Sequence, residues 1–217
     1  MKYLRSVWVV IFILLVSEKL SSQEITGIVN TKTTTIHFED FGYGDARFNG
    51  EIHSNFTGSK YTVNLKSDSG ELSGIIKDKF SKFHVDLKSP FGKIEGKIDR
   101  APNHTNDLWD IQVQGKKLVG KVTHNMMGTE DTYELNFDNK KITGSVHSKG
   151  TGLAYDLMFG EKKITGKMKY NVSTVKHTYS LSGTDLTPEE FNTFLFIECV
   201  KLINEYINDI DEFQNNH

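Results

Sequence analysis

The sequence predicts an all-β protein: an antiparallel meander of about seven hairpin repeats of ~23 residues, giving about 14 strands. These strands form a closed barrel or a strongly curved, barrel-like sheet, with a C-terminal α-helix packed in it or against its apolar face. Three observations lead to this fold class. They are a glycine-centred pentad that recurs along the chain, an alternating aromatic and aliphatic pattern beside it, and a helical pattern after the last repeat.

The pentad has an aliphatic or aromatic residue at each end and glycine at its centre, and it spans 25–29 in its first copy and 164–168 in its last. Successive central glycines lie 22 to 24 residues apart, which is the length of one repeated supersecondary unit. Glycine weakens a strand unless the missing side chain is used, so the row indicates either close packing and curvature or a shallow groove on the apolar face. The glycines are Gly27, Gly50, Gly74, Gly96, Gly120, Gly144 and Gly166.

The second pattern is an aromatic residue followed by alternating aliphatic ones, which is typical of strands with one covered face. We expect Phe137 to lie opposite Ile142 and Leu135 opposite Gly144, and the equivalent pairs to recur in the hairpins around 115 and 161. The apolar face so defined, with the start of the helix, is our candidate surface for helix packing or for an apolar ligand. It comprises Tyr61, Val63, Phe83, Val85, Trp109, Ile111, Tyr133, Leu135, Tyr155, Leu157, Gly96, Gly120, Gly144, Gly166, Phe191 and Leu195.

Turns between the two kinds of strand follow from the number of intervening residues. The segments 114–117, 138–141 and 160–163 suit tight two-residue turns, whereas 66–71 and 88–93 predict slightly longer loops. An odd count between Phe38 and Phe48 predicts a glycine bulge or an irregular loop. Pairing Leu181 beside Gly27 and Tyr179 beside Val29 would close the sheet; an open, strongly twisted sheet is the alternative.

The segment after the last strand predicts a helix over about 188–213. Thr187 is a good N-cap, Pro188 suits the first turn, and Glu190 completes a capping box. The first half of the helix is apolar almost all round, so we expect it inside the barrel or across its concave face. Its main apolar stripe is Phe191, Leu195, Cys199, Leu202, Tyr206, Ile210 and Phe213.

The N-terminus combines a basic start with an apolar run of about ten residues, which predicts a signal peptide over 1–22. An uncleaved anchor is the alternative. The expected domain is then the hairpin-repeat barrel or sheet of 23–183, on which the helix and tail of 184–217 pack. Cys199 is the single cysteine and is expected to be buried, so the fold has no disulfide within the chain.

The sequence offers no arrangement that predicts catalysis. Its glycines lie inside strands, its histidines lack metal-ligand spacing, and no nucleophile, base or carboxylate pair stands out, so we expect no enzyme, metal or cofactor. The formal net charge of -2 argues against nucleic acid. Met126 and Met127 predict either an exposed tip or a core plug.

These features favour a secreted, periplasmic or cell-surface protein that acts as a non-enzymatic structural or interaction module of the cell envelope. A protein partner would bind the variable loops 103–108, 124–132 and 149–154. One alternative is a carrier or sensor of an apolar, lipid-like molecule beneath the helix, which requires a continuous cavity of roughly 300 Å³. The other is an outer-membrane barrel, although each strand's apolar core is short against a belt of about 25 Å, and the mature chain is not expected to span a membrane.

Overall fold

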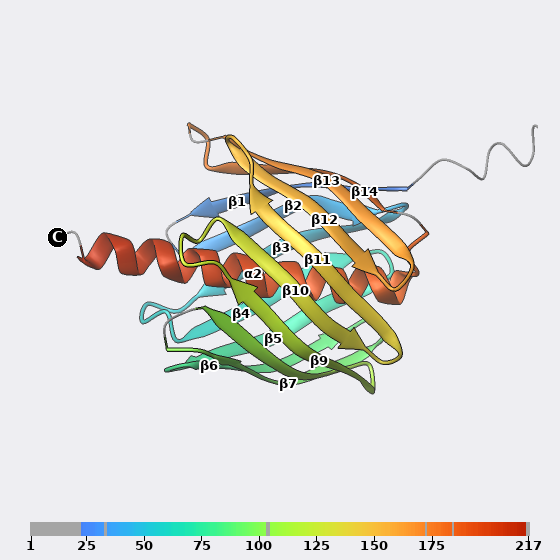
Figure 1. Ribbon diagram of the computed structural model, residues 1–217, viewed down its shortest axis with the longest axis horizontal. Coiled ribbons are helices and arrows are strands. Elements are labelled where there is room, and N and C mark those ends of the chain that lie inside the picture. Colours follow the sequence, from blue (N-terminus) through green and yellow to red (C-terminus); the bar gives the residue numbers. More distant parts are fainter. Residues whose placement is uncertain (1–22, 33, 103–104, 172, 184, 216–217) are drawn as a thin grey trace, which may run out of the picture.

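The computed structural model describes residues 23–32, 34–102, 105–171, 173–183 and 185–215, with the side chains of 208–215 left aside. The predicted signal peptide of 1–22 lies outside these residues. Within them the chain forms a closed barrel of 14 antiparallel strands and one C-terminal helix (Figure 1). The all-β meander that the repeats predict is therefore confirmed, and the sheet is closed.

Each strand pairs with its neighbours in sequence, and β1 pairs with β14 to close the sheet. The strands are 8 to 10 residues long, so neighbouring strands match in length. They are β1 Glu24–Lys32, β2 Thr35–Tyr43, β3 Ala46–Ser54, β4 Lys60–Ser67, β5 Gly70–Lys79, β6 Lys82–Ser89, β7 Gly92–Arg100, β8 Asn106–Val113, β9 Lys116–His124, β10 Glu130–Phe137, β11 Lys140–Ser148, β12 Gly152–Phe159, β13 Lys162–Asn171 and β14 Lys176–Gly183.

The period-two alternation of the sequence directs one face of every strand inward. In β4, Tyr61, Val63 and Leu65 are buried, whereas Thr62 and Asn64 between them are exposed. The buried apolar residues of the strands join one hydrophobic core with the helix. The apolar side chains therefore form an inside and the polar ones face outward, as expected for a sheet covered on one side only.

The predicted pairing within hairpins has the correct face but the wrong register. Leu135, not Phe137, lies opposite Ile142, and Tyr133 lies opposite Gly144. The hairpins β8–β9 and β12–β13 differ from the prediction in the same way. A shift of two residues leaves every side chain on its own face, so the hydrophobic pattern cannot detect it.

The strand glycines allow neighbouring backbones to approach closely. Gly144 has φ of 119°, and a Cβ atom there would lie 2.1 Å from the carbonyl oxygen of Asp156 on β12. Its opposite neighbour Tyr133 is an aromatic residue that can cover the glycine from β10. Of the two sequence interpretations of the glycine row, the structure supports close packing and curvature at this position.

The turns are tighter than the sequence predicts. Two-residue turns occur at 114–115, 138–139 and 160–161, as expected, and also at 68–69 and 90–91, where longer loops were wrongly predicted. The difference arises because the pairing continues to Ser67 opposite Gly70. The predicted bulge lies between Phe38 and Phe41 on β2, and its left-handed residue is Asp40 with φ of 49°, not a glycine.

Closure of the sheet is confirmed, again with a two-residue difference in register. Ile25 lies opposite Leu181 and Gly27 opposite Tyr179, whereas the sequence suggested Leu181 beside Gly27. Both edges of the sheet are paired by this ladder, so neither is left open for association with another chain.

The connections alternate between the two ends of the barrel. We call "turn end" the end that carries the short connections 44–45, 68–69, 90–91, 114–115, 138–139 and 160–161. We call "loop end" the end that carries the connections 33–34, 55–59, 80–81, 101–105, 125–129, 149–151 and 172–175. The final helix enters at the turn end and leaves at the loop end, where the C-terminus lies in Figure 1.

That helix, α2, spans Pro188–Asn215 and runs through the barrel (Figure 1). Every side chain from Glu190 to Ile203 is buried. Its rings contact walls that lie far apart around the sheet: Phe191 stacks on Phe41 of β2 at 6.4 Å between centroids, and Phe196 meets Trp109 of β8 edge-on at 5.8 Å. The helix therefore occupies the interior and forms the centre of the core.

Candidate functional site

The structure places the predicted apolar face against α2. All its non-glycine members belong to the core cluster, and Phe191 and Leu195 of the helix are 2% and 0% exposed. Tyr61 of β4 packs on Tyr206 near the loop end with 6.3 Å between ring centroids. Cys199 is buried as predicted, and burial raises the pKa of its thiol. These side chains pack on the helix, which occupies the space that an apolar ligand would need.

The start of α2 is fastened to the turn end by charge. Glu190 accepts hydrogen bonds from Lys140 at 2.6 Å and Lys162 at 2.7 Å, and from the backbone N–H of Thr187 at 2.8 Å. The Thr187 hydroxyl accepts the N–H of Glu190 at 3.2 Å, so the predicted capping box is confirmed. Burial alone would raise the pKa of Glu190, but these donors outweigh it and hold the pKa at about 2.

A buried polar cluster surrounds the middle of α2. Glu198 accepts hydrogen bonds from the hydroxyls of Tyr155 at 3.0 Å and Tyr179 at 3.3 Å, and burial raises its pKa. Lys201 donates to Glu205 at 2.7 Å. Burial alone would lower the pKa of Lys201. The carboxylates of Glu205 and Glu198 raise it by more than burial lowers it, so the ammonium stays charged.

This cluster stabilises the position of the helix and does not have the form of a catalytic centre. Glu198 and its two tyrosine partners are at most 3% exposed, so substrate cannot reach them without unpacking the barrel. Each polar group has a partner on another element or one helical turn away, which is the arrangement expected where buried polar groups fix one register of packing.

The role of these polar residues was not predicted, because the apolar residues around them dominate the sequence of the first half of α2. One signal was available: Tyr133, Tyr155 and Tyr179 recur at the aromatic position of successive repeats, and a buried tyrosine hydroxyl needs a partner. Asn192 shows that the match is incomplete, since neither its side-chain oxygen nor its nitrogen has a hydrogen-bond partner in the described part of the chain.

A second polar cluster ties α2 to the loop end. His124 lies between two carboxylates, with Nδ1 2.7 Å from Asp131 and Nε2 3.3 Å from Asp107, and Asn204 of the helix donates to Asp107 at 3.2 Å. Burial would lower the pKa of His124, but the two carboxylates raise it to about 10. The imidazolium is therefore charged at neutral pH, which makes it a poor general base and a poor metal ligand.

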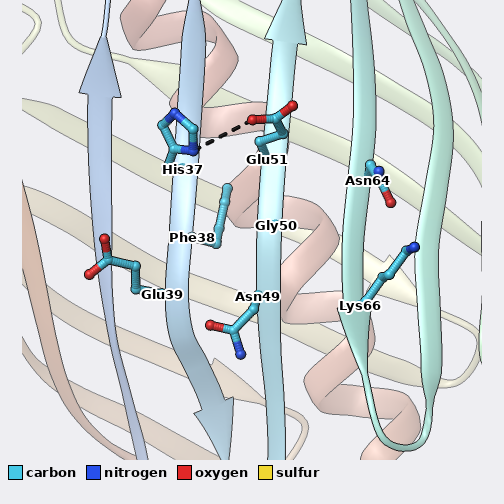
Figure 2. Close-up of a pocket in the computed structure, with 8 residues that line it drawn as sticks. All are labelled: His37, Phe38, Glu39, Asn49, Gly50, Glu51, Asn64 and Lys66. Atoms are coloured by element: carbon cyan, nitrogen blue, oxygen red, sulfur yellow. Dashed lines mark ion pairs between the residues drawn. The ribbon is translucent and has the colours of Figure 1, made fainter.

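Across the residues that the structure describes, no group of three or more His, Cys, Asp or Glu side chains is placed to hold a metal ion. One hollow of about 390 Å³ lies on the outer wall, open to solvent, where the β2 bulge meets β3 and β4. At one end of it in Figure 2, His37 and Glu51 point toward each other, with 3.5 Å between the imidazole Nδ1 and a carboxylate oxygen. Gly50 is one of its lining residues and lets β3 approach β4 closely, because a Cβ atom there would meet the Asn64 carbonyl oxygen at 2.0 Å.

The hollow is open, has a mixed polar and apolar lining, and lies beside the bulge of β2. Asn49 is engaged in holding the bulge: its Oδ1 accepts the N–H of Asp40 at 2.9 Å and its Nδ2 donates to the Asp40 carboxylate at 3.3 Å. The hollow is open to solvent, whereas pockets for small molecules enclose most of the surface of the ligand. We therefore place the candidate site elsewhere.

The loop end carries most of the large apolar side chains that the fold leaves in solvent. Phe56 and Phe80 are fully exposed, and Met126 and Met127 are 94% and 84% exposed, which resolves the sequence alternatives in favour of an exposed tip. Each sits at the tip of a connection, and Val175 in the last connection is 40% exposed. We call this set the apolar rim: Phe56, Phe80, Met126, Met127 and Val175.

Comparison with other proteins adds no identity: no protein family, curated protein or solved structure matches the chain. None of the helices in the described residues is long and apolar enough to cross a membrane. The class defined by the fold is a 14-stranded antiparallel barrel with its own C-terminal helix inside, and its candidate site is the apolar rim.

Proposed function

We propose that the protein is an exported, non-enzymatic interaction module of the cell envelope, and that it binds its partner through the loop end. The barrel and α2 form the scaffold, and the apolar rim with its neighbouring loops forms the binding surface. The observation that carries the proposal is the exposure of Phe56, Phe80 and Met126, each at the tip of a different loop and none covered by the chain itself.

The filled interior supports a module over a carrier. Phe191 and Phe196 of α2 contact β2 and β8, and Glu198 contacts β12 and β14, so the helix reaches walls on several sides. An apolar ligand would have to displace this helix and unpair its buried charges, which costs several kcal/mol per uncompensated group. Native mass spectrometry of the purified protein is expected to give the mass of the polypeptide without a bound lipid.

The polar outer surface of the barrel favours a protein surrounded by water over an outer-membrane barrel. The outward positions of the central strands carry side chains such as Lys97, Asp110, Glu134 and Asp156, and a lipid-facing band would need apolar residues there. Export rests on the apolar run of the predicted signal peptide. Mass spectrometry of secreted protein is expected to find a mature N-terminus near residue 23.

The proposed binding surface is tested by association with envelope fractions of the cells that produce the protein. Replacing Met126 and Met127 by serine is expected to lower this association. The matched control is Phe91→Ser, because Phe91 is 43% exposed at the turn end. Association that responds equally to both changes, or to neither, would count against the loop end as the binding surface.

A further inference from the structure

The loops that carry the apolar rim are built to hold their tips outward. In the loop 55–59, the side-chain oxygen of Asn55 accepts the N–H groups of Ser59 and Lys60 at 2.9 and 3.0 Å, and its carbonyl accepts the N–H of Gly58 at 3.0 Å. This cage fixes the loop without any contribution from Phe56. The phenyl ring of Phe56 lies in solvent and makes no contribution to the packing of the fold.

The loop 125–129 repeats the same construction three hairpin repeats further along the chain. The side-chain oxygen of Asn125 accepts the N–H groups of Thr129 and Glu130 at 2.7 and 3.2 Å, and its carbonyl accepts the N–H of Gly128 at 2.9 Å. Gly58 and Gly128 both have φ of 65°. In both loops the residue directly after the asparagine, Phe56 or Met126, is the exposed tip.

The third tip, Phe80, is held by a different set of hydrogen bonds, and its backbone is strained. Phe80 has φ of 59°, a conformation that a bulky residue adopts at a cost, and its ring is fully exposed. The buried guanidinium of Arg100 donates to the Phe80 carbonyl at 3.1 Å and to both oxygens of Asp78 at 2.7 and 2.6 Å. Glycine or asparagine would suit this turn better, so its phenylalanine has no explanation within the fold.

We infer that the partner of the apolar rim is a phospholipid membrane surface, into which the tips insert from the loop end. The inference rests on the proposed function and names its partner. Protein partners are recognised through a contiguous, close-packed patch, whereas the tips here are one or two side chains on each of four separate loops at the loop end. A fluid lipid interface accommodates such separate side chains, because each finds acyl chains wherever it enters.

The charge around the rim fits the same partner. Exposed lysines accompany the tips. Of the acidic residues there, Asp78 and Asp131 are paired with Arg100 and His124, while Glu130 is exposed. When the tips are inserted, the ammonium groups of these lysines lie at the level of the lipid phosphates and attract anionic headgroups. The polar outer wall then limits the depth of insertion to the tips. The lysines are Lys32, Lys60, Lys77, Lys79, Lys149 and Lys169.

The test is vesicle co-sedimentation of the chain from residue 23, which holds the whole barrel and α2. The vesicles are phosphatidylcholine alone and phosphatidylcholine with phosphatidylserine. We expect binding to both, tighter with phosphatidylserine and weakened by salt there. The triple substitution Phe56→Ser, Phe80→Ser and Met126→Ser is expected to lower the partition coefficient at least about tenfold, whereas Phe91→Ser at the turn end is expected to leave it within about twofold.

A second measurement places the tip directly. Phe80→Trp is expected to shift its fluorescence to the blue when vesicles are added, and Phe91→Trp is not, while buried Trp109 contributes equally to both. Failure of the parent protein to bind either vesicle, or equal binding by the triple variant, overturns the lipid inference. If envelope association still depends on the rim in that case, the partner is a protein and the proposed function stands.

Discussion

Replacing Glu190 by glutamine is expected to weaken the whole barrel, because this carboxylate fastens α2 at the point where it enters. Its pKa falls from an ordinary 4.5 to about 2 in the folded protein. A tenfold change in proton affinity corresponds to about 1.4 kcal/mol, so the difference corresponds to about 3 kcal/mol at neutral pH. Lys140 and Lys162 are 51% and 28% exposed, and water screening reduces the expected loss to about 2 kcal/mol.

The pH dependence follows from the sign of this change. A carboxylate whose folded pKa is depressed stabilises the fold above its unfolded pKa of 4.5, and this contribution disappears as the pH falls through about 2. The parent and E190Q are therefore expected to differ in free energy of unfolding at pH 7 and to converge as the pH falls from 4.5 towards 2. Urea unfolding followed by circular dichroism across this range measures the difference.

Glu189 provides the matched control for this experiment. It forms one ion pair with Lys116, and the two side chains are 30% and 40% exposed. A pair of this kind contributes at most about 1 kcal/mol, so E189Q is expected to unfold close to the parent. Equal losses in E189Q and E190Q, or a difference between E190Q and the parent that does not change with pH, would refute the reasoning.

Three further predictions concern the core. Gly144→Val is expected to lower stability by at least about 2 kcal/mol through backbone strain and contact with β12, whereas Thr143→Val changes it little; thermal melting compares them. Asn192→Leu removes an unpaired buried amide and is expected to raise the melting temperature by roughly 2–4 °C; a lower value would contradict this. Deleting 188–217 is expected to cause aggregation, and a monodisperse truncated barrel on size exclusion would show that α2 is dispensable.

The fold class could be predicted because a period of two fixes which face of a strand each side chain occupies. Tyr133, Leu135 and Phe137 were assigned to one face, and all three are buried. Closure followed from the complementary half-repeats at the two ends, and it is observed between β1 and β14. Helix position followed from an apolar segment that cannot remain in water.

The register could not be predicted with the same rules, because the turn decides it. The sequence 138–141 is compatible with pairing either Asp138 or Phe137 as the last residue of its strand. In the structure Phe137 pairs with Lys140, and Asp138 takes φ of 55° in the turn. The choice depends on backbone conformation at one residue, and aspartate tolerates the left-handed region without requiring it.

The candidate site was only partly accessible from the sequence. The loops 124–132 and 149–154 were expected at a binding surface, and Met126 and Met127 do lie exposed at a tip. Phe56 and Phe80 were missed, because an aromatic residue beside a strand pattern is normally assigned to the core. A repeated Asn-x-x-Gly in 55–58 and 125–128 was the signal that these are tight loops with an outward tip.

The residues that fasten the start of α2 and the residues proposed to bind the partner lie at opposite ends of the barrel. The charged fastening of α2 by Glu190 lies at the turn end, whereas the tips Phe56, Phe80 and Met126 lie at the loop end and have no part in the core. A core that is complete without the tips can tolerate strain at Phe80 and apolar surface in solvent, because neither is large against the burial of a whole helix. Substitutions at the turn end should therefore change unfolding and leave binding, and substitutions at the tips should do the reverse.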